Sequence, residues 1–135
     1  MSDDDFSDDD FLAAFEACTL PKELFHHADH VRMAYLYLTR YPPLEALERF
    51  SASLLRFATS LGKPDRYHET ITWAFLLLIR ERMARAGERQ TFGEFVEANP
   101  DLLDWKENVL KRYYREETLS SGLARSTFVL PDRPV

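Results

Sequence analysis

The chain has 135 residues, of which 45% are hydrophobic and 30% charged, as is typical of one globular domain. Its single cysteine, Cys18, excludes a disulfide framework and a zinc–thiolate cluster within one chain, and it favours the reducing cytoplasm. With only 4 glycines for tight turns, a many-stranded β fold is disfavoured.

The net charge of −6 is concentrated near the N-terminus. Residues 1–21 contain six Asp and one Glu but no Lys or Arg, which leaves 16 acidic against 17 basic residues in 22–135. This nearly neutral body has no basic face interleaved with aromatic residues, so we expect no nucleic-acid partner. The longest apolar run, residues 73–79, is too short to span a bilayer, and no secretory signal precedes it. We therefore expect a cytoplasmic protein with no membrane partner.

The acidic segment leads into the first predicted helix. Residues 1–7 are expected to be a mobile acidic leader, followed by a single helical domain over 8–135. Ser7 and Asp10 have the spacing of a capping box, and apolar residues then recur at helical spacing as far as Cys18. This pattern predicts a helix with Cys18 as an inert, buried thiol on its apolar side.

Four further helices follow from apolar spacing and from the residues that begin and end helices. The second is expected over 27–41 and the third over 43–61, where Gly62 can adopt a left-handed conformation. The fourth is expected to begin at Pro64–Asp65, to be buried on most sides and to end at Gly87. A capping box formed by Thr91 and Glu94 predicts a short fifth helix through Ala98.

The C-terminal third is expected to contain a long helix over 102–116, a helical turn over 120–125 and an extended tail from Thr127 to Pro131 that lies across the helices. The predicted fold is therefore all-α, an irregular bundle of five or six helices with an extended C-terminal tail.

All four histidines lie in two short segments, 25–32 and 67–72, each at the expected start of a helix. In the helix expected over 27–41, His27 and His30 share the apolar face. In the fourth predicted helix, the spacing places His68 on the same face as Thr72 and several apolar residues. If the two helix starts meet, three imidazoles converge, with Asp29 and Glu69 close by in sequence.

Such a cluster has two chemical interpretations. Imidazoles and a carboxylate can bind a divalent transition metal, with His27, His30 and His68 as the ligands. Imidazoles beside carboxylates can instead transfer protons near neutral pH. Neither spacing is diagnostic of either chemistry. The competing interpretation is structural, because His, Asp and Thr at helix starts can satisfy free backbone N–H groups.

Three blocks of sequence also carry a resemblance: Phe-His-His-Ala-Asp-His-Val-Arg at 25–32, Tyr-His-Glu-Thr-Ile-Thr at 67–72 and Leu-Ala-Arg-Ser-Thr-Phe-Val-Leu-Pro-Asp at 123–132. Together they resemble a family of uncharacterised small bacterial proteins. The resemblance implies a bacterial origin and one domain but no mechanism. It links Arg125 to the two histidine segments, because the three blocks recur together.

Three functions remain open at this stage. The first is a small-molecule enzyme, or an accessory enzyme of a bacterial pathway, with His27, His30, His68, Asp29 and Glu69 as its catalytic groups. Arg125 would bind an anionic substrate group, and Tyr114 is either a second substrate contact or a core residue. The alternative is a non-catalytic module that binds a small ligand or a metal. A protein–protein adaptor is a third hypothesis, for which only the acidic leader argues.

Overall fold

A computed structural model describes residues 7–87 and 90–133. Within these ranges there are seven α-helices and no strand, which confirms the all-α prediction. None of the described helices is long and apolar enough to cross a membrane. The chain divides into two compact units, 1–67 and 68–135, and each is described by itself. The prediction of a single domain over 8–135 therefore stays a prediction, and the leader lies outside the described residues except for Ser7.

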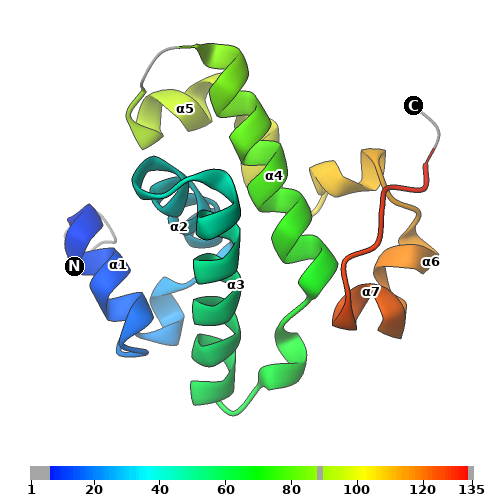
Figure 1. Cartoon of the computed structure of the whole chain (residues 1–135), viewed down its shortest axis with the longest axis horizontal. Helices are drawn as coiled ribbons and strands as arrows, with labels where there is room; N and C mark the ends of the chain where they lie inside the picture. Colours follow the sequence, from blue (N-terminus) through cyan, green and yellow to red (C-terminus); the bar gives the residue numbers. More distant parts are fainter. Residues whose placement is uncertain (1–6, 88–89, 134–135) are drawn as a thin grey trace. The chain divides into compact units, whose positions relative to one another are not determined.

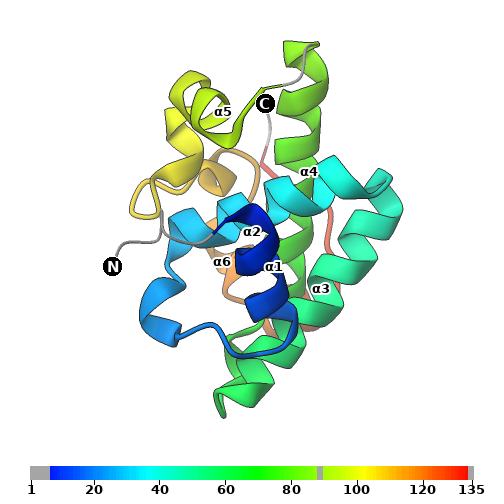
Figure 2. The ribbon, with the colours of Figure 1, turned by 90° about the vertical axis from the view of Figure 1, so that its left-hand side faces the viewer.

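The first unit contains three α-helices that lie side by side (Figures 1 and 2). Two 3-10 turns connect them to one another and to the second unit. The elements in chain order are α1 (Asp8–Glu16), η2 (Lys22–Leu24), α2 (His27–Arg40), α3 (Pro43–Ser60) and η3 (Pro64–Arg66).

An aromatic cluster forms the core of this unit. Phe15 is fully buried, and its ring centroid lies 5.3 Å from that of Phe25 and 5.5 Å from that of Phe57. Phe50 contributes a third ring, at 6.4 Å. Phe15 belongs to α1, Phe25 to the segment before α2, and the other two rings to α3. The cluster therefore holds the segment before α2 against α1 and α3.

The helix α1 begins as predicted and ends earlier than predicted. The Ser7 side chain accepts the Asp10 N–H at 3.1 Å and caps the helix. The helix ends at Glu16 because the N–H groups of Thr19 and Leu20 both turn back to the Ala14 carbonyl. Cys18 lies beyond this end with a left-handed φ of 60° and is only half-buried. The expectation of a buried thiol on the helix face is therefore wrong.

The second unit is built on α4 (Glu69–Ala86), which ends at Gly87 with a left-handed φ of 73°, as predicted. The helix α5 (Phe92–Ala98) begins with the predicted capping box. Its Thr91 Oγ1 accepts the Glu94 N–H at 3.1 Å, and the Glu94 carboxylate accepts the Thr91 N–H at 2.9 Å.

The predicted long helix over 102–116 is wrong. This stretch forms two 3-10 helices, η4 (Pro100–Leu103) and η5 (Val109–Arg112), before the short α6 (Glu116–Leu119) and α7 (Gly122–Ser126). Two side chains replace helical hydrogen bonds between them, since Asp104 accepts the Glu107 N–H and Asn108 accepts the Leu110 N–H, each at 2.9 Å. Local side-chain acceptors of this kind compete with the backbone ladder of a helix.

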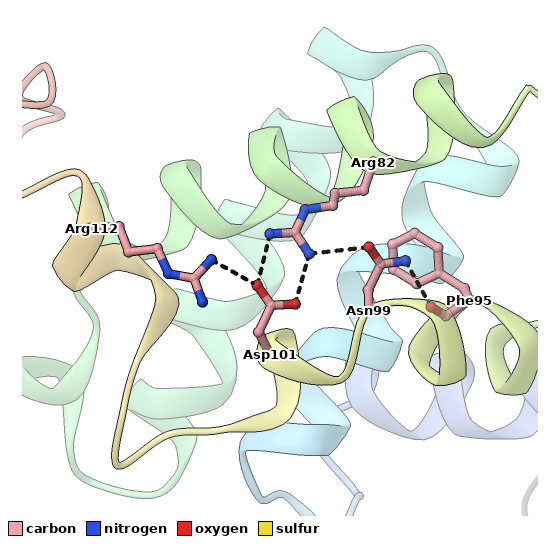
Figure 3. Close-up of polar contacts among 5 residues, drawn as sticks. All are labelled: Arg82, Phe95, Asn99, Asp101 and Arg112. Carbon is pink, nitrogen blue, oxygen red and sulfur yellow. Dashed lines mark hydrogen bonds and ion pairs between the residues drawn. The ribbon is translucent and has the colours of Figure 1, made fainter. Parts of the chain in front are cut away.

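A charged network fastens η4 to α4 (Figure 3). Arg82 donates to both carboxylate oxygens of Asp101, at 2.7 and 2.9 Å, and also to the Asn99 side chain at 3.1 Å. Arg112 donates to the same carboxylate at 3.1 Å. The hydrogen bonds from Arg82 hold the pKa of Asp101 below its ordinary value, so the carboxylate is charged at neutral pH.

We expect Asp101→Asn to lower the free energy of unfolding of the second unit by about 1–2 kcal/mol, because it replaces a two-pronged charged contact at a partly buried position. Tryptophan fluorescence during urea unfolding measures this loss, since Trp73 and Trp105 both belong to the second unit. Arg112→Gln is the matched control. Its guanidinium is largely exposed, so its loss should cost less than about 0.5 kcal/mol. Equal losses for the two variants would contradict this account.

Candidate functional site

The start of α2 carries three of the four histidines. His26 precedes the helix in an extended conformation, and its N–H donates to the Asp29 carboxylate at 2.9 Å. The Asp29 N–H in turn donates to the His26 carbonyl at 3.0 Å, and the Asp29 side chain is buried. The carboxylate therefore fixes the first turn of the helix, which fits the structural interpretation of Asp29.

His30 packs against an aromatic ring of the first unit's core. Its imidazole stacks on Phe25 with ring centroids 4.0 Å apart and an interplanar angle of 28°. Burial, together with smaller contributions from repulsion by His27 and then His26, lowers the pKa of His30 to about 4. At neutral pH the His30 ring is uncharged.

His27 is the first residue of α2 and lies one turn before His30, half-buried. His26 and His27 lie close enough to His30 to contribute to the lowering of its pKa. His27, Asp29 and His30 all lie in the first turn of α2, and their role in a functional site stays a prediction. The sequence did not indicate the role of Phe25, although an aromatic residue directly before a histidine pair was a visible pattern.

His68 occupies the position before α4. Its Nδ1 accepts the Ile71 N–H at 3.1 Å, and its Nε2 donates to the Leu119 carbonyl at 2.7 Å, which requires the neutral tautomer with the proton on Nε2. The ring is 7% exposed. The two nitrogens thus join the start of α4 to the end of α6.

The fourth helix begins later than the predicted start at Pro64–Asp65. Pro64 to Arg66 form a separate 3-10 turn, and both Tyr67 and His68 are extended, so α4 begins only at Glu69. Thr72 donates its hydroxyl to the His68 carbonyl at 2.7 Å and so stabilises the first turn of α4.

The environment of His68 disfavours its charged form. Burial lowers its pKa below the ordinary value, against the opposing effect of the hydrogen bond to Leu119, and the positive charge of Arg125 lowers it as well. Arg125, an exposed residue of α7, is thus within electrostatic reach of His68 in the second unit.

Two other predicted residues make contacts within the second unit. Glu69 accepts the Trp73 indole N–H at 3.0 Å. Tyr114 is 1% exposed and donates its hydroxyl to the Val129 carbonyl at 2.8 Å, while burial raises its pKa. These contacts fit structural roles, and the prediction that Tyr114 and Arg125 bind a substrate stays a prediction.

The predicted residues thus fall into two groups, with His27, Asp29 and His30 in the first unit and His68, Glu69, Tyr114 and Arg125 in the second. A site that joins His68 to the other histidines stays a prediction. Among residues 7–87 and 90–133, no three side chains of His, Cys, Asp or Glu form a group that could hold a metal ion, so metal binding by His27, His30 and His68 has no structural support.

Comparison with known proteins adds no relative. No protein-family model matches the chain, and no curated protein or solved structure matches it significantly. The resemblance to a family of small bacterial proteins stays a prediction based on the three sequence blocks.

Proposed function

We propose that the chain binds a small, planar, polar molecule at the start of α2 and that His30 and His68 do not act as proton-transfer groups. The observation that carries the proposal is the state of His30, an uncharged imidazole that stacks on Phe25 beside two further histidines. A neutral imidazole offers one N–H donor and one nitrogen acceptor, which is the chemistry that positions a polar ligand.

The alternative, an enzyme that uses these histidines for acid/base chemistry, requires a group that titrates near the working pH. His30, with a pKa of about 4, is a poor base and is almost never protonated at pH 7. Both ring nitrogens of His68 are engaged by backbone groups, so neither can reach a substrate in this conformation. These two observations favour binding over turnover.

The proposed setting is a bacterial cytoplasm. A single cysteine suits a reducing compartment, and the family that the three sequence blocks resemble is bacterial.

The test uses the untagged chain labelled with ¹⁵N, to which benzamide, nicotinamide, imidazole-4-carboxamide and Zn²⁺ are added separately. We expect at least one of the amides to shift the backbone resonances of residues 26–30 in a saturable way. His27→Ala and His30→Phe should weaken this binding at least about tenfold, which corresponds to the loss of one good polar contact. The exposed His26→Gln is the matched control in the same segment.

Three outcomes would count against the proposal. Saturable shifts confined to other segments would place the site elsewhere. Binding of Zn²⁺ alone would favour the metal hypothesis. Conversion of the added amide over hours, followed by proton NMR, would favour the enzyme.

A further inference from the structure

The segment after α7, residues 127–133 (the red end of the ribbon in Figure 1), packs on the second unit as an extended chain rather than as a helix. Thr70, a fully buried residue of α4, donates its hydroxyl to the Thr127 carbonyl at 2.9 Å and accepts the Val129 N–H at 3.1 Å. One hydroxyl therefore bonds two backbone groups spaced two residues apart, as a neighbouring strand would.

The contacts with the backbone continue along the segment. The Val129 carbonyl accepts the hydroxyl of the buried Tyr114 at 2.8 Å, so both backbone groups of Val129 are satisfied by buried side chains. Further on, the N–H groups of Asp132 and Arg133 both donate to the Tyr113 carbonyl, at 3.1 and 2.9 Å.

One side chain of the segment, that of Phe128, makes a specific aromatic contact. The Phe128 ring stacks on Trp73 with centroids 5.1 Å apart and an interplanar angle of 17°. Trp73 is itself oriented by the hydrogen bond of its indole to Glu69. On either side of Phe128 the chain is less specific, because Thr127 is exposed and Leu130 is 76% exposed.

These contacts are of the kinds that a receptor for an extended peptide uses. Main-chain hydrogen bonds supply affinity for any extended chain, and one aromatic contact supplies selectivity, which is how peptide-binding domains divide the two tasks. If the segment left, the hydroxyls of Thr70 and Tyr114 would lose these partners to water, and another extended backbone could restore the same hydrogen bonds.

We propose that this surface of the second unit is a docking site for an extended peptide with an aromatic residue, and that residues 127–133 occupy it in cis. The partner is an extended segment of another protein in which an aromatic residue precedes a residue with a free N–H. The tethered segment competes at a high effective concentration, so a partner binds well only when the cis contacts are weakened. This site is distinct from the proposed small-molecule site in the first unit.

The test measures binding of a fluorescent synthetic peptide of residues 126–133 to the full chain by anisotropy. Phe128→Ala weakens the cis segment while leaving the receptor intact, so we expect this variant to bind the peptide at least about tenfold more tightly than the unaltered chain. Adding Thr70→Val should abolish the gain, because valine keeps the shape of threonine but cannot hydrogen-bond. A peptide with alanine at the Phe128 position should bind neither chain.

The proposal is overturned if Phe128→Ala binds no more tightly than the unaltered chain, or if the peptide binds equally well without Thr70 or without its own phenylalanine. Circular dichroism shows whether Phe128→Ala retains its helices. If it does not, Val129→Pro takes its place, because proline removes the N–H that reaches Thr70 and suits an extended chain. The same comparison of affinities then decides the question.

Discussion

Acidification from pH 7 to pH 4 should remove about 3 kcal/mol of stability through His30 alone. The unfolded chain binds this proton with the ordinary pKa of 6.5, whereas the folded chain binds it with a pKa of about 4. Between these values the unfolded state holds more protons, so the free energy of unfolding falls as the pH falls through this window, by about 1.4 kcal/mol per unit. Above pH 6.5 the contribution is fully present.

Urea unfolding followed by circular dichroism at several pH values measures this loss. His30→Phe keeps a ring against Phe25 and cannot titrate. The free energy of unfolding of this variant should therefore fall by about 3 kcal/mol less than that of the unaltered chain between pH 7 and pH 4. His26→Gln removes an exposed histidine, and this variant should still show the loss of stability that His30 causes. An identical pH dependence in His30→Phe and the unaltered chain would show that the His30 imidazole is not held in its neutral form.

Replacement of His68 by alanine should destabilise the second unit by about 2–3 kcal/mol. The Ile71 N–H loses its cap, which costs about 1 kcal/mol, and the Leu119 carbonyl loses the donor of a hydrogen bond at a mostly buried position, which costs about 1–2 kcal/mol more. Tryptophan fluorescence during urea unfolding reports on this unit. His68→Asn supplies a new capping oxygen and should recover about 1 kcal/mol.

The matched control for this change is Arg66→Ala, an exposed residue shortly before His68, which should cost less than about 0.5 kcal/mol. A His68→Ala variant as stable as the unaltered chain would refute the structural role. If it also lost ligand binding, His68 would belong to a functional site, as the sequence first suggested.

The elements that the sequence predicted well are those whose ends are fixed by local chemistry. Ser7 and Thr91 cap their helices through groups three residues away, and Gly62 and Gly87 adopt the left-handed conformation that ends a helix. All of this information lies within a few residues of each boundary, so it can be found without knowing the fold.

The features that could not be predicted depend on local competition or on distant partners. Apolar spacing predicted a helix over 102–116, but Asp104 and Asn108 divert the backbone N–H groups into turns. The histidine segments were found, yet the state of the His68 ring depends on residues far along the chain. The partner of His68 is the Leu119 carbonyl, 51 residues away, and no sequence pattern points to it.

The central claim is that His30 and His68 are held neutral by packing and hydrogen bonding and do not exchange protons near pH 7. A long-range ¹H–¹⁵N NMR titration of the imidazole nitrogens tests it most directly, because it reports the tautomer and the pKa of each ring. We predict that His68 has its proton on Nε2 with a pKa below 6.5, and that His30 titrates at about 4. A pKa between about 6 and 7.5 for both rings, with mixed tautomers, would contradict the account and restore the proton-transfer enzyme.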